Sequence, residues 1–130
     1  MSYVYLAQPY TYVGTAPKST EKIRELMDLR YNAGMIATYQ LLQHRIWVHA
    51  PIVHCHEMAM KFNLPKDFQF WREYNFAMIR HANELIILTI PGWEESRGVR
   101  EEAEFARTCG IPVTPLSPKD VDAYAIASAR

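Results

Sequence analysis

The segment Leu-Ile-Ile-Leu-Thr-Ile at residues 85–90 constrains the fold of this 130-residue chain more than any other feature. It is a continuous apolar run rich in β-branched side chains, which is typical of strands buried on both faces of a parallel sheet. Segments with helical periodicity precede and follow it. Strands that alternate with helices indicate a parallel sheet covered by helices on both faces. We therefore expect one α/β domain over residues 1–130, a small doubly wound sheet of the Rossmann or flavodoxin-like kind.

Three further strands and four helices complete the alternation. Ser19 or Thr20 is a suitable N-cap for the longest helix, in which apolar residues recur at helical spacing up to about His44. Gly110 is placed to end the helix of residues 97–108. The other predicted strands are 3–7, 46–53 (with Pro51 near its end) and 111–115; the other helices are 67–81 and 119–129, with a loop and a short helix before Leu64. For the helix of 67–81, the predicted apolar contacts are Phe70, Trp71, Tyr74, Met78 and Ile79.

Ligands of open parallel sheets bind beyond the carboxyl ends of the strands. In this chain the rule selects three loops, which follow Ala7, Val53 and Ile90. We expect the functional residues to gather where these loops meet.

The helix of residues 97–108 places one carboxylate on its apolar side. At about 100° per residue, Glu102 falls inside an arc formed by apolar side chains, namely Val99, Ala103, Phe105, Ala106 and Cys109. Removing a carboxylate from water costs several kcal/mol, so an inward glutamate requires a partner or a function. Two interpretations fit: a nucleophile or acid–base group in the ligand crevice, or a core-edge glutamate paired with Arg30 or Arg80.

The turn Ser96-Arg97-Gly98 opens the same helix. Amide groups at a helix start have no intrahelical acceptor, and together with the helix dipole they bind phosphate or carboxylate groups. The alternative is that Ser96 is an ordinary N-cap and Gly98 an incidental first-turn residue.

Histidines and a tryptophan are further candidates near the crevice. His54 and His56 flank Cys55 after the second predicted strand, and they lie on one side if the chain is extended. A metal site needs three or four ligands, and no matching second cluster is present in the sequence, so we expect no metal and a crevice-lining or packing role. Trp93 is placed to stack on a base, to act as a lid, or to contact another subunit.

Composition narrows the partners. Fourteen Lys and Arg balance fourteen Asp and Glu, which argues against a surface that coats a nucleic acid polymer. No apolar run is long enough to span a bilayer, and two cysteines cannot build a disulfide framework. No leader-like segment precedes the first strand. We therefore expect a cytoplasmic protein with a small-molecule ligand and no membrane or nucleic acid partner.

Two motifs resemble those of the nucleoside 2-deoxyribosyltransferase-like family, which includes N-glycosidases that act on nucleoside 5′-monophosphates. The first is Tyr5-Leu-Ala-Gln-Pro-Tyr10 at the end of the first strand. The second is Ser96-Arg-Gly-Val-Arg-Glu-Glu102, followed by Ala106 and by Gly110-Ile-Pro-Val113. The similarity extends over nearly the whole chain, and the order of elements agrees.

The resemblance implies roles for individual residues. Glu102 corresponds to the nucleophile, which attacks the anomeric carbon and forms a covalent glycosyl-enzyme that water or a second base resolves. Ser96 and Gly98 inherit contacts with a 5′-phosphate, and Tyr5 or Tyr10 orients the carboxylate or the sugar. The expected substrate-binding set also includes Ala7, Gln8, Pro9, His54, Trp71, Asn75, Trp93 and Arg97. The resemblance further implies that the protein needs no cofactor and that it forms a homo-oligomer, a dimer or larger.

The chain departs from the family's pattern at two places. The first loop, Gln8-Pro-Tyr-Thr-Tyr, lacks the Gly-Ser-Ile-Arg-Gly type of run that the nucleotide hydrolases use for phosphate. Where related proteins carry an aspartate one turn after a tryptophan, Trp71 is followed by Asn75. An amide cannot act as a general acid, so the group that protonates the leaving base stays open; Glu95 and Asp67 are candidates that no motif singles out.

Three functions therefore compete. The leading hypothesis is cleavage or transfer of the N-glycosidic bond of a nucleoside or nucleoside 5′-monophosphate. The alternative is a non-catalytic nucleotide-binding or sensing domain on the same scaffold, in which Glu102 recognises a ribose hydroxyl. A third is a purely structural oligomer subunit, which predicts no stabilisation by ligand.

Overall fold

The fold is a four-stranded parallel sheet with helices on both faces, which confirms the predicted doubly wound α/β class. The structure, a computed structural model, describes residues 2–11, 19–65 and 68–128. The strands β1 (Val4–Ala7), β2 (Val48–His49), β3 (Glu84–Leu88) and β4 (Val113–Leu116) pair in the order β2-β1-β3-β4, every pair parallel. The helices are α1 (Thr20–Gln43), α2 (Pro51–Phe62), α3 (Phe68–Arg80), α4 (Arg97–Thr108) and α5 (Val121–Ser128), the last preceded by a 3₁₀ turn, η1 (Pro118–Asp120).

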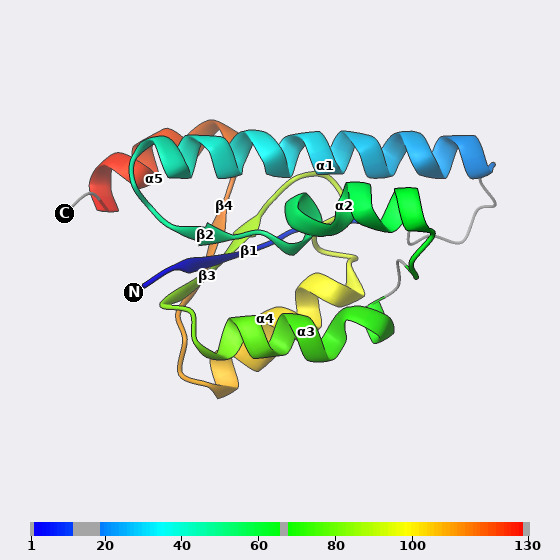
Figure 1. The fold of residues 1–130 in the computed structure, drawn as a ribbon. Helices are drawn as coiled ribbons and strands as arrows, with labels where there is room; N and C mark the ends of the chain where they lie inside the picture. The colour runs from blue at the N-terminus through cyan, green and yellow to red at the C-terminus, as the bar shows by residue number, and fades with distance from the viewer. Residues whose placement is uncertain (1, 12–18, 66–67, 129–130) are drawn as a thin grey trace.

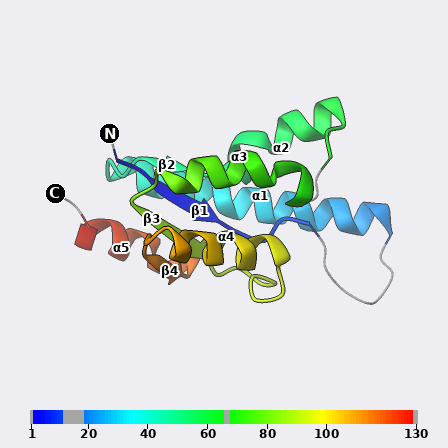
Figure 2. The ribbon, with the colours of Figure 1, turned by 90° about the horizontal axis from the view of Figure 1, so that it is seen from below.

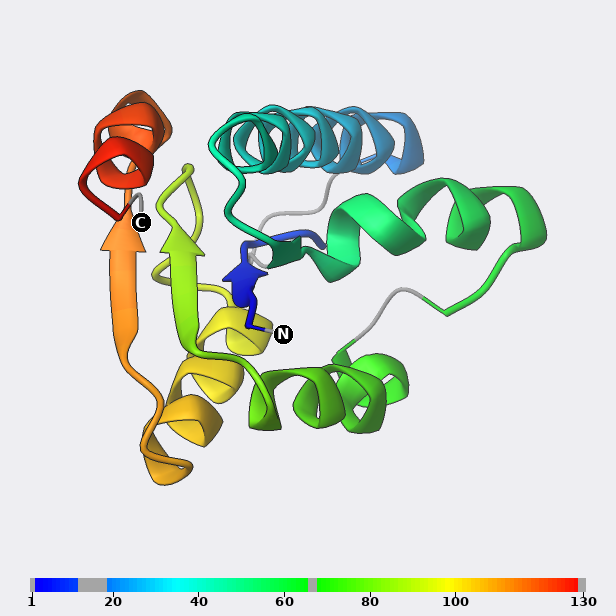
Figure 3. The same ribbon diagram turned by 60° about the vertical axis from the view of Figure 1, so that its left-hand side comes forward.

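The helices divide into two layers. In Figure 1, α1 and α5 lie above the sheet, and α3 and α4 lie below it. Figure 2 looks onto the side that carries α3 and α4. Figure 3 shows α2 beyond the β2 edge of the sheet, beside α1.

Alternation along the central strands produces two separate cores. Val4 and Leu6 of β1 point into a cluster with α1 and α5, whereas Tyr5 and Ala7 point into a cluster with α3 and α4. Leu41 of α1 anchors the first cluster and is fully buried. Each face of the sheet is thus sealed by its own pair of helices.

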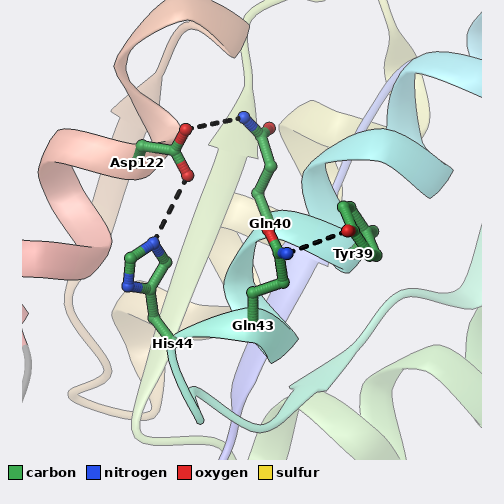
Figure 4. A network of polar contacts seen from close by, with 5 residues as sticks. All are labelled: Tyr39, Gln40, Gln43, His44 and Asp122. Carbon is green, nitrogen blue, oxygen red and sulfur yellow. Dashed lines mark hydrogen bonds and ion pairs between the residues drawn. The ribbon is translucent and has the colours of Figure 1, made fainter.

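Polar side chains tie α1 to α5 at the solvent-exposed rim of the first core. Gln40 Nε2 donates to one oxygen of Asp122 over 3.2 Å, and His44 Nε2 lies 3.4 Å from the other oxygen (Figure 4). Within α1, Gln43 Nε2 donates to the Tyr39 hydroxyl over 2.8 Å. These contacts surround the apolar core without entering it.

The second strand is much shorter than the sequence predicts. The prediction of a strand over 46–53 is wrong, because β2 ends at His49 and Pro51 is the first residue of α2. Proline suits the first turn of a helix, where its missing N–H is not needed and its φ is already helical. The predicted loop after Val53 is therefore a helix, and the helix that follows β2 is a full 12 residues long.

Other boundaries agree more closely. Helix α4 has the predicted bounds, and α1 begins after the N-cap Ser19, whose side chain accepts from Lys22 N. Helix α3 is confirmed from Phe68 onward; Asp67 lies outside the described residues. Two of its predicted apolar residues, Phe70 and Tyr74, are exposed and meet the ring of Trp71 instead of the core, and Asn75 takes an inward position.

Connections leave the two central strands in opposite directions. The chain leaves β1 through α1 to β2 on one side, and leaves β3 through α4 to β4 on the other. Such a reversal opens a crevice at the carboxyl ends of the two strands. Among the described residues, no helix combines the length and apolar character needed to cross a membrane.

Candidate functional site

A cavity of about 250 Å³ lies at this reversal point. It is bordered by the loop after β1, the first turns of α2, one side of α3 and the start of α4. Its lining residues are Gln8, Tyr10, Thr11, Pro51, Ile52, Cys55, His56, Ala59, Phe68, Gln69, Trp71, Asn75, Ser96, Arg97, Gly98 and Glu102. Most of the wall is apolar, and a few polar groups converge on it, as in ordinary small-molecule sites.

Glu102 is buried in the wall of this cavity, with 6% of its surface exposed. Tyr5 Oη donates to Glu102 Oε2 over 2.9 Å, and Asn75 Nδ2 donates to the same oxygen, also over 2.9 Å. Within the described residues no donor reaches Oε1. One carboxylate oxygen is thus fixed by strand β1 and helix α3, and the other is left for whatever occupies the cavity.

Burial raises the pKa of Glu102 from 4.5 to about 7, and the hydrogen bonds from Tyr5 and Asn75 partly oppose that rise. The two donors favour the ionised carboxylate, whereas the apolar surroundings favour the neutral acid. Near neutral pH the side chain therefore exists in both protonation states, which is the usual condition of an acid, base or nucleophile in an active site.

Pairing with an arginine, the alternative interpretation of the inward Glu102, is wrong. Arg30 donates to main-chain oxygens of Tyr10, Thr11 and Pro91, and so joins the loop after β1 to the loop after β3. Arg80 lies 5.5 Å above the Phe105 ring. No cation among the described residues forms an ion pair with Glu102.

Tyr5 belongs to the site through its contact with Glu102. Its ring is fully buried beneath the cavity, and burial together with the nearby carboxylate raises the pKa of its hydroxyl well above 10. The hydroxyl therefore stays protonated and acts as a permanent donor. Behind it, 5.8 Å between ring centroids, lies His49, whose pKa falls to about 4 because it is buried.

The start of α4 has the geometry that its sequence predicts. Ser96 is the N-cap, and its hydroxyl oxygen accepts from Val99 N over 3.2 Å. Ser96, Arg97 and Gly98 all line the cavity. The Arg97 side chain is half exposed and bonds to Glu101 one turn later. Ser96 is therefore a capping residue and a cavity residue at once.

The loop after β1 contributes less of its length than predicted. Gln8 and Tyr10 line the cavity, whereas Ala7 and Pro9 are buried and do not. The Gln8 side chain reaches α1, where its Nε2 donates to Arg30 O over 2.7 Å. It passes across Gly34, where an added Cβ would lie 1.9 Å from Gln8 Oε1.

The structure separates the remaining predicted residues into two groups. Trp71 and Asn75 line the cavity; Trp71 Nε1 donates to Pro65 O, and its ring meets Tyr74 at 6.0 Å. Trp93 does not line it and packs against the core beneath α3 and α4. His54 is exposed and lies outside the cavity wall. The prediction that His54 and His56 share a side is wrong, because residues two apart on a helix point in different directions.

His56 lines the cavity; the sequence leaves a crevice-lining role and a packing role open for it. It is buried, and its Nδ1 shares a hydrogen bond with Tyr10 Oη. Its Nε2 lies 3.1 Å from Asp28 Oδ1, and Tyr31 stacks on its ring at 4.3 Å. No sequence signal links Asp28 on α1 to a histidine on α2. The described residues contain no cluster of three His, Cys, Asp or Glu side chains able to hold a metal ion.

The fold is α/β, and the point where its connections reverse holds a buried carboxylate, Glu102, that no cation among the described residues neutralises. This combination is typical of a ligand-binding or catalytic site. A family model with the description "Domain of unknown function (DUF1937)" matches residues 2–117, so the chain belongs to that family. The match contains every residue that lines the cavity and excludes α5. A comparison with curated proteins found no match.

Proposed function

We propose that this protein cleaves or transfers the N-glycosidic bond of a nucleoside or nucleoside 5′-monophosphate, with Glu102 as the nucleophile. The observation that carries the proposal is the asymmetry of that carboxylate: two donors hold Oε2, and no described donor engages Oε1. Motifs around Tyr5 and Glu102 resemble those of the nucleoside 2-deoxyribosyltransferase-like family, and these two residues are in contact here.

The reaction follows from this arrangement. Oε1 attacks the anomeric carbon as the bond to the base nitrogen breaks, and the base departs with the electron pair. The product is an ester between Glu102 and the sugar, which water or a second base then resolves, as in retaining glycosidases. Tyr5 and Asn75 stabilise the carboxylate that leaves in this second step.

A 5′-phosphate fits the start of α4. The first amides of a helix attract anions, and Arg97 stands beside them. A second hollow of about 200 Å³ adjoins the cavity at Thr11 and Ser96, and its wall includes both Arg30 and Glu95. We expect Arg97→Gln to weaken binding of 5′-monophosphates and to leave the corresponding nucleosides unaffected.

The direct test is release of free base from a panel of nucleosides and 5′-monophosphates, with and without an acceptor base. Glu102→Gln should lower release on the order of 10⁴-fold or more, the usual effect of losing a nucleophile. Glu104→Gln, an exposed residue on the same helix, is the matched control. If wild-type protein releases no base while a nucleotide still raises its melting temperature, the catalytic proposal fails and a sensing function replaces it.

We also propose that the protein self-associates, as the resemblance implies. Large apolar side chains are exposed on α1 and just after it, including Leu29, Ile36, Tyr39 and Trp47. Such side chains are common in subunit interfaces. Sedimentation velocity over a range of concentrations tests this; a monomer at every concentration would exclude it.

A further inference from the structure

A second polar group faces the same cavity and has no part in holding Glu102. Tyr10, in the loop after β1, shares a hydrogen bond with His56 of α2, and His56 contacts Asp28 of α1. Tyr10 and His56 line the cavity, whereas the Asp28 side chain is 54% exposed behind them. Three elements that are far apart in the sequence thus form one chain of polar contacts, which runs from solvent to the cavity.

The contacts fix which nitrogen of His56 carries the proton. A carboxylate only accepts hydrogen bonds, so the Nε2 that faces Asp28 holds a proton. When the imidazole is neutral, Nδ1 is an acceptor and the Tyr10 hydroxyl donates to it. When the imidazole is charged, Nδ1 donates to the Tyr10 oxygen, and the Tyr10 proton is then directed elsewhere. Tyr31 stacks on the same ring, with the two ring centroids 4.3 Å apart.

We propose that Tyr10, backed by His56 and Asp28, is the acid–base group of the glycosidic reaction. This inference rests on the proposed function and supplies the proton donor that Asn75 cannot be. In the first step His56 is charged: the Tyr10 hydroxyl gives its proton to the departing base nitrogen, and Nδ1 gives its proton to the Tyr10 oxygen. The base leaves neutral, and His56 is left neutral.

The second step reverses the transfer. The oxygen of water, or a ring nitrogen of an incoming base, attacks the anomeric carbon, and Glu102 leaves as a carboxylate with the electron pair of the broken ester bond. The proton of the attacking water or base passes to the Tyr10 oxygen as the Tyr10 proton passes to Nδ1, which restores the charged imidazole. The two steps move protons through Tyr10 in opposite directions, so the cycle closes and no other acid or base is required. Histidine oriented by a carboxylate is the arrangement that serves this purpose in other enzymes.

The surroundings of Tyr10 favour a hydroxyl that passes a proton on as it receives another, and they disfavour a tyrosinate that exists by itself. Burial, with smaller contributions from Asp28 and Cys55, raises the pKa of its hydroxyl to about 12. A free tyrosinate is therefore disfavoured, and Tyr10 gives up a proton only as His56 replaces it. The hydroxyl remains a phenol before and after each step.

The test compares substrates that differ in whether the leaving group needs a proton. Guanosine, deoxyguanosine and their 5′-monophosphates leave as a base that must be protonated, whereas their N7-methyl derivatives already carry the positive charge that protonation would supply. Single-turnover release with enzyme in excess isolates the first step. If the wild-type protein cleaves only pyrimidine substrates, 4-nitrophenyl furanosides replace the methylated compounds.

Tyr10→Phe should slow release from the parent substrates by about 10²- to 10⁴-fold, the range of general acid catalysis, and slow release from the methylated ones by less than about tenfold. Asp28→Asn, a positioning residue, should give a smaller loss with the same selectivity. Tyr39→Phe and Glu25→Gln, which are exposed residues on α1, are the controls. Thermal unfolding verifies that each variant is folded.

The outcomes separate the two proposals. Equal losses on both kinds of substrate would mean that Tyr10 only positions the ligand, and no loss on either would mean that another group protonates the base. Both results would overturn the acid–base assignment and leave Glu102 as the nucleophile. If wild-type protein releases no base from either substrate, the proposed function fails, and the assignment of Tyr10 fails with it.

Discussion

The two faces of the sheet differ in where their polar side chains lie. On the face covered by α1 and α5, the core is apolar, and Gln40, His44 and Asp122 meet at its exposed rim. On the face covered by α3 and α4, a carboxylate lies inside the core, held by Tyr5 and Asn75 and by no cation among the described residues. The first face keeps its ionisable groups outside the apolar cluster, including Glu84 of β3, a part-buried carboxylate that accepts from Thr114 and Tyr124. The second accepts an ionisable group at a cost in stability, which is the mark of a functional site.

The two buried polar groups at the cavity, Glu102 and His56, are held by different elements. Asn75 and Tyr5 act on Glu102 from a helix and a strand that pack directly against α4. His56 is held instead from α1 and from the loop after β1. The cavity therefore takes its polar groups from the loop after β1 and from α2, α3 and α4, and α1 supports one of them from behind through Asp28.

The largest effect on stability is expected on the apolar face. Leu41→Ala removes a fully buried side chain and should lower the free energy of unfolding by about 2–5 kcal/mol. Base release per folded molecule should stay unchanged, because Leu41 is remote from the cavity wall. Urea denaturation gives the first quantity; the neighbouring Leu42→Ala, which is largely exposed, is the control. A loss of activity in folded Leu41→Ala would show that the two faces are coupled.

Glu102→Gln should stabilise the protein, and the gain should depend on pH. The folded pKa of about 7 lies above the ordinary 4.5, so the folded state retains a proton that the unfolded state has lost. The carboxylate therefore lowers stability progressively as pH rises from 4.5 through 7. The variant should be about 3 kcal/mol more stable above pH 8, and little different below pH 4.

Denaturation curves of the two proteins between pH 4 and 9 measure this difference. Glu104→Gln, with an exposed side chain, should follow the wild type throughout. Curves for wild type and Glu102→Gln that stay parallel across the range would mean that the buried carboxylate carries no pH-dependent cost.

Tyr5→Phe should move the pH dependence of base release. The reaction requires ionised Glu102, so the acidic limb of the rate–pH profile should have its midpoint near pH 7 in the wild type. The Tyr5 hydrogen bond lowers that pKa, and its loss raises the midpoint and slows release about tenfold at pH 6, the effect of roughly one charged hydrogen bond. The test is to measure the rate of base release as a function of pH for Tyr5→Phe and for the control Tyr74→Phe. A midpoint that stays at the wild-type pH in Tyr5→Phe would contradict the role of Tyr5.

The smallest effect is expected from the rim of the apolar face. Asp122→Asn disrupts contacts with Gln40 and His44, but the Asp122 side chain is more than half exposed. Exposed ion pairs contribute about 0–1 kcal/mol, and salt weakens them further. Urea denaturation at low and high salt should therefore differ little between variant and wild type. A cost well above 1 kcal/mol would make this rim part of the structural core.

The sequence predicts α4 and its inward glutamate well, because periodicity, the N-cap Ser96 and the stop at Gly110 all act within one helix. It does not predict the partners of Glu102, since Arg30 and Arg80, the two candidate arginines, bind elsewhere. Tyr5 and Asn75 reach the carboxylate through packing between distant elements, for which a local pattern gives no signal.

The prediction of the second strand over 46–53 is wrong for a different reason. Pro51 fits both the end of a strand and the first turn of a helix, and the apolar residues around it match either period. Assigning the segment to a strand placed His54 in the crevice and made the two histidines neighbours. With α2 starting at Pro51, His56 faces the cavity instead, and its partner Asp28 comes from a helix that the sequence treats as a cover for the sheet.

Helix α1 has a further consequence for how the chain tolerates change in length. Within two turns it presents Asp28 to His56, Arg30 to the two loops, and the bare backbone of Gly34 to Gln8. Toward its other end, Ala37 and Leu41 fix it to the sheet. One residue inserted between these parts would rotate the first by about 100° against the second. Such an insertion would turn the first part, including Ala33 on the apolar face, away from its partners, while Ala37 and Leu41 keep their place against the sheet.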